Sequence, residues 1–195
     1  MMNYVLNQYL ELLTRPGKTL HPDWWDILNM KSAYTSYFNS GRVFQNEVDL
    51  ELRSKRNFLL NQNVDYAYLP EESDIFLLKS LPNLERLITF SGLVLLKCPD
   101  YLYLKEYRTL LMSFFSNDQL NQLHIFWLGG NNEPCFDSDL FLKALFSAGM
   151  FAINVELREC RLWPLIAFTL PVSQLVIPVD STGVFKRIKR MERFL

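Results

Sequence analysis

Apolar residues recur at helical spacing along most of this chain, and proline or glycine interrupts the runs. The clearest run places its apolar side chains mostly three or four residues apart: Tyr103, Tyr107, Leu110, Leu111, Phe114 and Phe115. Such spacing puts side chains on one face of an α-helix. The pattern predicts an all-α protein with a single compact helical domain over residues 1–195. Only residues 165–179, with two short apolar stretches, leave room for one β pair.

Capping residues and helix breakers set the predicted helix boundaries. We expect helices over approximately residues 3–14, 22–28, 84–96, 103–115, 118–127, 138–155 and 184–194. The segment 84–96 is apolar on all sides, which is typical of a buried central helix. Residues 31–71 are more polar and less regular, and they leave room for a mobile loop.

The composition argues against several classes of protein. The 195 residues are 49% hydrophobic and 14% aromatic, which is too apolar for a disordered chain. The formal net charge of −1 gives no overall attraction to nucleic acid, so we expect no nucleic-acid partner. Cys98, Cys135 and Cys160 form no CxxC pair, so neither a zinc site nor a disulfide framework is indicated. Free thiols are typical of a reducing cytoplasm.

The stretch Leu162 to Val179 carries no charge and is long enough to be tested as a membrane span. It contains Pro164, Pro171 and Pro178, and each proline removes a backbone donor that lipid cannot replace. We therefore expect extended segments on the protein core and no direct membrane span. The first residues lack a basic segment followed by an apolar one, so no secretory signal is predicted. These features together predict a cytoplasmic protein.

No established catalytic motif occurs in the sequence. It contains two histidines and lacks the GxSxG, HExxH, GxGxxG and P-loop patterns. Acidic neighbours such as Asp137 and Asp139 resemble first-turn helix charges rather than a catalytic pair. We therefore predict a protein that is not an enzyme, with no catalytic residues, no metal ligands and no cofactor. A small helical enzyme that uses a metal or cofactor ranks third among the interpretations.

Two features are candidates for contact with a partner. The predicted C-terminal helix carries five cations: Lys186, Arg187, Lys189, Arg190 and Arg193. They suit an acidic partner, lipid headgroups or phosphates, although charge runs are more often plain solvent-exposed surface, which is the favoured interpretation. Trp24 and Trp25 form the second feature. On a helix they point about 100° apart, so we expect one in the core and the other against the first helix or a partner.

Four residues of the turn after the first helix carry a resemblance to a known family: Pro16, Leu20, His21 and Pro22. Their spacing resembles a motif of the SctK family, the accessory cytosolic proteins of type III secretion injectisomes. Thr19 departs from the family, in which an aromatic residue is common at that position. Further similarity follows in the same order along the chain, over residues 84–96, 123–129, 146–151 and 162–171.

This resemblance implies a structural role in the cytoplasmic sorting platform of a type III secretion system. There the chain would be an adaptor that links the pod protein (SctQ family) to the cytoplasmic domain of the inner-membrane ring protein (SctD family). It would associate with the inner-membrane apparatus only through these partners, and we expect a monomer when it is isolated. The alternative is a cytoplasmic regulator or secretion chaperone that binds a client of the same system.

Overall fold

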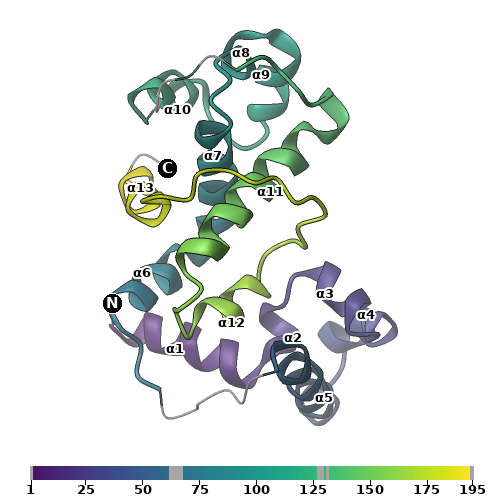
Figure 1. Ribbon diagram of the computed structural model, residues 1–195. Coiled ribbons are helices and arrows are strands. Elements are labelled where there is room, and N and C mark those ends of the chain that lie inside the picture. The colour runs from purple at the N-terminus through teal and green to yellow at the C-terminus, as the bar shows by residue number, and fades with distance from the viewer. Residues whose placement is uncertain (1, 62–67, 127–129, 131, 194–195) are drawn as a thin grey trace. The chain divides into compact units, whose positions relative to one another are not determined.

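The computed structural model describes residues 2–61, 68–126, 130 and 132–193, and every regular element among them is a helix (Figure 1). The all-α prediction is therefore confirmed. Contacts within the chain define two compact units. Unit 1 comprises residues 1–81 and 160–172, and unit 2 comprises residues 82–159 and 173–195. The prediction of one domain over residues 1–195 stays a prediction.

Unit 1 is built from helices of the N-terminal half and one short helix from near residue 165. They are α1 (Met2–Thr14), α2 (Pro16–Thr19), α3 (Pro22–Ile27), α4 (Lys31–Asn39), α5 (Arg42–Leu60), α6 (Glu72–Ser80) and α12 (Trp163–Ala167). The predicted helices at 3–14 and 22–28 are thereby confirmed. A buried cluster is formed by Leu20, Trp25, Leu28, Met30, Tyr37, Val48, Leu52 and Phe168.

Helix α5 is the main departure from the sequence-based expectation in unit 1. Its 19 residues form one continuous helix in the region where we expected irregular structure and a loop. Its buried face includes Asp49 and Arg56 beside apolar residues, and these charges hide the apolar pattern. The Arg56 Nη1 donates to the Leu12 carbonyl at 2.7 Å, which explains how a cation is accommodated there. Residues 62–67 of the expected loop lie outside the described residues.

Unit 2 is organised around two helices that cross in direct contact. Its elements are α7 (Leu84–Leu95), α8 (Asp100–Tyr103), α9 (Lys105–Leu111), α10 (Asn117–Gln122), the 3-10 turn η2 (Leu123–Phe126), α11 (Ser138–Glu156) and α13 (Val184–Met191). The 3-10 turn η1 (Leu81–Asn83) spans the boundary between the two units. A Cβ added to Gly92 of α7 would lie 1.8 Å from the Leu145 carbonyl oxygen, and one added to Gly149 of α11 would lie 2.0 Å from the Ile88 oxygen. Only glycine permits this approach of the two backbones.

The remaining helix predictions for unit 2 have mixed outcomes. The buried central helix is confirmed as α7, where every residue from Leu87 to Leu95 is buried. The predicted helix 103–115 is shorter in the structure: Tyr103 is the last residue of α8, Leu104 takes an extended conformation (ψ 126°), and α9 ends at Leu111. Helix α13 begins at Gly183 in a left-handed conformation (φ 67°) and not at a side-chain cap. Residues 127–129, at the end of another predicted helix, lie outside the described residues.

Residues 165–179 form no strand, so the expectation of a β pair there is wrong. Pro164 lies in the first turn of α12, where its missing N–H costs no helical hydrogen bond, and the helix ends at Ala167. The expectation of extended segments over residues 162–179 is therefore wrong for the first part, which is helical. From Pro171 to Asp180 the chain has no regular secondary structure and pairs with no strand among the described residues, so no ladder forms.

Among the described helices, α11 alone is long and apolar enough to cross a membrane by length and composition. In the most apolar 18-residue stretch of this helix, 56% is buried inside the protein, and the buried face packs on α7. Helix α11 packs closely against α7 in the centre of unit 2. A central helix must present apolar residues to its neighbours, and this accounts for its apolar character. The core position of α11 thus explains its composition without a membrane.

Candidate interaction surfaces

The turn from Pro16 to Pro22 lies between α1 and α3 in unit 1 and contains the single-turn helix α2. Pro16 is the first residue of α2 and is buried, and the Leu20 N–H donates to the Pro16 carbonyl at 2.8 Å. The Leu20 side chain enters the buried cluster. His21 is the N-cap of α3, where its Nδ1 accepts from the Asp23 N–H at 3.3 Å, and Pro22 is the first helical residue. Each motif residue therefore has a defined structural role in this turn.

This turn is fastened to the segment that follows α12, and we call the contact between residues 21–24 and 168–172 the junction. The His21 N–H donates to the Phe168 carbonyl at 2.9 Å. The Trp24 Nε1 donates to the Leu170 carbonyl at 2.9 Å, and the Trp24 and Phe168 rings lie 4.4 Å apart. The Val172 N–H donates to the Asp23 carboxylate at 3.1 Å. Three hydrogen bonds and one ring contact thus join segments almost 150 residues apart.

A buried carboxylate supports the start of the same turn. Asp49 of α5 is 2% exposed, and its Oδ1 accepts from the Gly17 N–H at 2.8 Å. The Tyr37 hydroxyl donates to both carboxylate oxygens at 3.1 and 3.2 Å, and the Arg15 Nε lies 4.0 Å away. Burial raises the pKa of Asp49 despite these donors, and burial together with the Asp49 charge raises the pKa of Tyr37 to about 12.

Sequence reasoning missed Asp49, although the sequence contains a signal for it. Asp49 lies beside Val48 and three residues before Leu52, so it occupies the apolar side of an amphipathic helix. An acidic residue in such a position needs donors from elsewhere in the chain, because a buried charge without hydrogen bonds is costly. The donors here come from residues 15–17 and 37, which periodicity in α5 cannot reveal.

The two adjacent tryptophans point in different directions, as their spacing predicts. Trp25 is 1% exposed and packs edge-on against Tyr34 and Tyr37, with ring centroids 5.2 and 5.5 Å away. Trp24 is half-buried in the junction. Trp24 therefore covers the segment after α12 and not the first helix. A role of either residue in partner binding stays a prediction.

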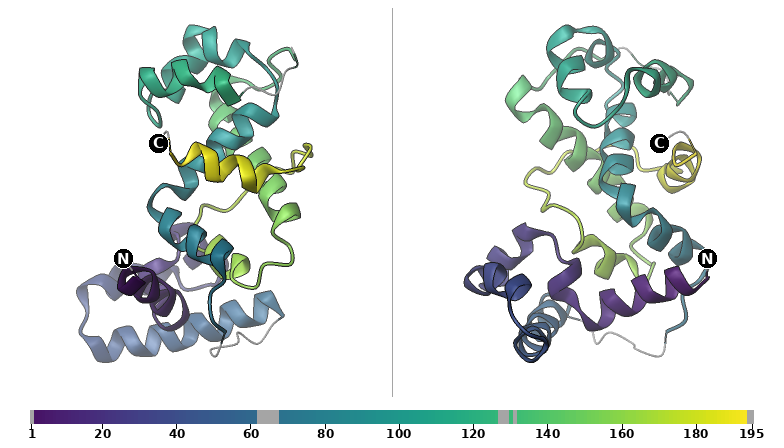
Figure 2. Two further views of the ribbon diagram at one scale, coloured as in Figure 1. Left: turned by 90° about the vertical axis from the view of Figure 1, so that its left-hand side faces the viewer. Right: turned by 180° about the vertical axis from the view of Figure 1, so that it is seen from behind.

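The five cations of the C-terminal segment lie on or just after α13. Lys186, Arg190 and Arg193 are exposed, whereas Arg187 and Lys189 are partly buried. The Lys189 ammonium lies 4.9 Å from the centre of the Phe185 ring. In Figure 2 the yellow α13 lies across the teal α7, and it contacts both α7 and α11. The predicted amphipathic helix is thus present, and its role in binding stays a prediction.

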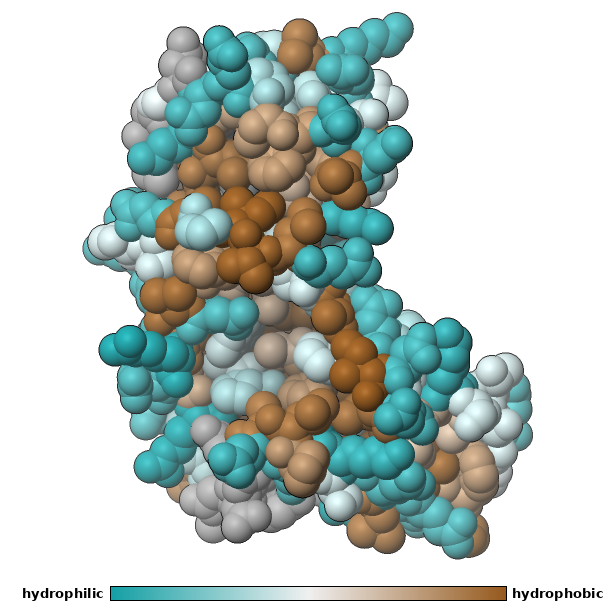
Figure 3. Space-filling model, turned by 45° about the vertical axis from the view of Figure 1, so that its right-hand side comes forward, coloured by the Kyte–Doolittle hydropathy of each residue, from teal (hydrophilic) through white to brown (hydrophobic). Residues whose placement is uncertain are grey.

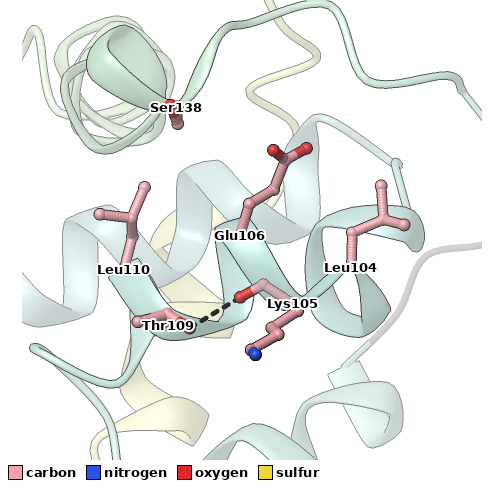
Figure 4. Close-up of a pocket in the computed structure, with 6 residues that line it drawn as sticks. All are labelled: Leu104, Lys105, Glu106, Thr109, Leu110 and Ser138. Atoms are coloured by element: carbon pink, nitrogen blue, oxygen red, sulfur yellow. Dashed lines mark hydrogen bonds between the residues drawn. The ribbon is translucent and has the colours of Figure 1, made fainter.

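A solvent-open depression of about 670 Å³ lies in unit 2 between α9 and the start of α11 (Figure 4). It is lined by Leu104, Lys105, Glu106, Thr109, Leu110 and Ser138. The Thr109 hydroxyl is used in a bond to the Lys105 carbonyl at 2.8 Å. The lining combines two leucines with four polar or charged residues, which suits a side chain of a partner better than bond-making chemistry.

The described residues include no group of three or more His, Cys, Asp or Glu that could hold a metal ion. Cys160 donates to the Asp74 carboxylate at 3.1 Å, and burial followed by this bond raises the pKa of its thiol to about 11. Such a thiol is protonated at neutral pH and is a poor nucleophile. This cysteine is therefore a packing residue of unit 1.

Comparison with protein families gives one match. A family described as type III secretion system subunit matches residues 6–172. The chain belongs to this family. The match covers most of the chain, so the assignment to a type III secretion system made from the Pro16-to-Pro22 motif is confirmed at this level. Neither a curated protein nor a solved structure matches the chain.

The C-terminal limit of the family match coincides with a feature of the fold. The matched range contains the whole motif turn, the crossing of α7 and α11, and both sides of the junction. It ends at Val172, whose N–H makes the last hydrogen bond of the junction. Residues 173–195 of this secretion subunit, which include α13 and its cations, lie beyond the matched range.

Proposed function

We propose that this secretion subunit is an adaptor of the SctK kind in the cytoplasmic sorting platform. It links the pod protein (SctQ family) to the cytoplasmic domain of the inner-membrane ring protein (SctD family), and it performs no catalysis and needs no cofactor. It works in the cytoplasm and associates with the inner-membrane apparatus through these two partners. Membership of the secretion-subunit family supports the setting. The presence of two units, each with its own exposed apolar surface, supports the adaptor role.

Unit 1 presents an apolar surface on α5, formed by Val43, Leu50 and Phe58. These residues are spaced seven and eight apart, so they share one side of the helix. Phe58 is 85% exposed. Isolated apolar residues are normal on a protein surface, but several on one helix face mark a site for a partner. Figure 3 illustrates how brown apolar side chains interrupt the teal hydrophilic surface of the protein.

Unit 2 presents a different apolar surface around the depression beside α9. Leu104 lines the depression and is exposed, and Tyr103 and Leu140 are exposed one and two residues from lining residues in the sequence. A concave site that combines leucine side chains with polar groups suits a protruding side chain of a partner. An adaptor requires two separate binding surfaces, and each unit supplies one.

Paired substitutions can assign the two surfaces. Leu50→Glu with Phe58→Glu should abolish binding to one partner, and Leu104→Glu with Leu140→Glu should abolish binding to the other. A charge placed in an apolar contact must be desolvated, so each pair should weaken its complex at least about tenfold. Binding is measured by pull-down and titration calorimetry with the purified pod and ring proteins.

Val176→Glu is the matched control, because this apolar residue is also highly exposed but lies on neither surface. Circular dichroism should show that all variants retain their helices. The adaptor proposal is contradicted if the unaltered chain binds neither protein. Binding of a secreted client in their place would favour the chaperone alternative.

A further inference from the structure

Helix α13 is a fixed part of unit 2. Val184, Ile188 and Met191 are fully buried, and the helix packs on α7 and α11. The Phe185 N–H donates to the Glu156 carboxylate at 2.7 Å, which places a negative charge at the helix N-terminus. Because the apolar face of α13 is already used inside the protein, it cannot insert into lipid as a surface helix would.

Lys186 and Arg190 of this helix, together with Arg193 in the turn just after it, form an outward row that we call the cationic stripe. They are spaced four and three residues apart, and the backbone stays helical at Glu192, so the three side chains continue along one side. All three are exposed, and among the described residues no ion pair or side-chain hydrogen bond includes them. Arg187 differs from them: hydrogen bonds from Thr182, and then the charges of Lys97 and Arg187, lower the pKa of the Asp180 carboxyl.

Helix stability explains only part of the stripe. Arg190 lies in the last turn, where a cation favours the helix, but Lys186 lies in the first turn, where a cation is unfavourable. Like charges four residues apart, such as Lys186 and Arg190, also destabilise a helix. Residues 173–195 contain five Lys and Arg against two Asp and Glu, a charge of +3, while the whole chain carries −1. A local excess of unpaired cations of this kind makes the stripe a candidate surface for an anionic partner.

We propose that the cationic stripe binds an acidic helical segment of a partner protein, with Asp or Glu at positions i, i+4 and i+7. This inference deepens the adaptor function and rests on it, since it gives the chemistry of one partner surface. An acidic helix that lies alongside the stripe has the same rise per residue as α13. Its acidic side chains at i, i+4 and i+7 can therefore each face one cation, and three ion pairs can form together. Two of the three cations are arginines, whose guanidinium groups bind carboxylates in a bidentate manner.

Two other anionic ligands fit the stripe less well. A membrane surface would be held by charge alone, because the apolar face of α13 is sealed in unit 2. A single-stranded nucleic acid is usually held by aromatic stacking as well as charge, and the stripe contains no aromatic residue. The acidic helix needs only the cations that are present.

The test uses the full chain and a fluorescent helical peptide with Glu at i, i+4 and i+7. A second peptide with Gln at those positions is the isosteric comparison. We expect the Glu peptide to bind at least about tenfold more tightly than the Gln peptide, and salt should weaken this preference. Lys186→Gln with Arg190→Gln and Arg193→Gln should abolish the preference.

A matched control removes the same charge elsewhere. Lys18→Gln with Lys79→Gln and Lys143→Gln takes three exposed cations from other helices and should leave the preference intact. A second variant, Lys186→Glu with Arg190→Glu, should instead prefer a peptide with Lys at the three positions. This reversal tests the stripe even if the neutral variant loses stability.

Several results would overturn the inference. They are equal binding of the two peptides, an equal loss in the control variant, or tighter binding to phosphatidylglycerol vesicles or to a single-stranded DNA than to the Glu peptide.

The adaptor function is tested separately by pull-down of the pod and ring proteins. If the unaltered chain captures both and the neutral stripe variant captures both equally well, the inference fails while the adaptor function stands. If the unaltered chain captures neither protein, the adaptor function fails whatever the peptides show.

Discussion

The Asp49 carboxylate is surrounded by protein on all sides, and its contacts show how single polar residues shape unit 1. It accepts from the Gly17 N–H and the Tyr37 hydroxyl, so it links α2, α4 and α5. A Cβ added to Gly17 would lie 2.5 Å from the Tyr37 ring, which means that no larger residue fits between them. The position of the family motif therefore depends on polar contacts as well as on apolar packing.

Asp49→Ala should lower the free energy of unfolding by roughly 3 kcal/mol. The substitution leaves the Gly17 N–H and the Tyr37 hydroxyl buried without an acceptor, and each such loss costs about 1–3 kcal/mol. Asp49→Asn keeps one acceptor oxygen and removes the buried charge, so its cost should be at most half as large. Urea denaturation of the two variants measures the difference, and equal losses would contradict this account of the site.

Alkaline pH should destabilise unit 1 through Cys160. Its pKa is raised from 9.0 to about 11, so between these values the thiol stays protonated in the folded protein but ionises in the unfolded chain. The unfolded state then binds fewer protons, and stability falls as pH rises from about 9 to 11. In urea titrations Cys160→Ala should lose less stability over this range than the unaltered protein.

At the scale of elements, the crossing of α7 and α11 determines unit 2. Small residues at the contact let two helix backbones touch, and Gly92 faces the Leu145 carbonyl while Gly149 faces that of Ile88. Close contact of this kind buries nearly all of both helices near the crossing. The remaining helices of unit 2, α13 included, pack around this pair.

Gly92→Ser should destabilise the protein by about 1–3 kcal/mol, because the added side chain forces the two helices apart and overpacks the core. Gly41→Ser is the matched control, since nothing lies within 4 Å of a Cβ added there. Serine also serves well as an N-cap residue, which is the position of Gly41 before α5. The control should change stability by at most about 0.5 kcal/mol in thermal and urea unfolding. Equal effects of the two substitutions would contradict the close contact.

Elements defined by local signals could be predicted from the sequence, and those that depend on distant partners could not. Helix α10 begins at Ser116 with a capping box to Gln119, a signal contained within four residues. Helix α5 was obscured because Asp49 and Arg56 on its buried face bond to atoms 32 and 44 residues away. The break at Leu104 was also missed, since the apolar spacing continues through it.

The same reasoning applies to the candidate site. The Pro16-to-Pro22 turn and its placement between two helices were predictable from proline and capping chemistry. The junction was not, because Trp24 and Asp23 bond to residues 146 and 149 positions further along the chain. Helical spacing describes one element at a time and contains no information on such pairings.

For the whole molecule, the path of the chain connects the two units more than once. It passes from unit 1 to unit 2 after Leu81, back after Glu159, and again to unit 2 after Val172. Both units therefore contain segments that are distant in sequence, and neither is a continuous stretch that could be cut out. We infer that they fold as one domain, as the sequence predicts.

Destabilising unit 2 should accordingly lower the unfolding midpoint of unit 1. The test introduces Gly92→Ser into a Trp127→Phe background, in which the remaining tryptophans, Trp24, Trp25 and Trp163, all belong to unit 1. Their fluorescence and the helical circular dichroism should shift together to lower urea concentration, as in a two-state transition. An unchanged fluorescence midpoint, with a separate earlier transition by circular dichroism, would show two independent domains.

The central claim is that this secretion subunit connects two proteins, and the most direct measurement is a bridging experiment. The cytoplasmic domain of the ring protein is immobilised, and the pod protein is passed over it with and without this chain, with surface plasmon resonance as the readout. The account predicts that the pod protein is retained only when the chain is present, and that the Leu50→Glu, Phe58→Glu and the Leu104→Glu, Leu140→Glu variants each abolish retention. Retention of the pod protein without the chain, or no retention with it, would contradict the account.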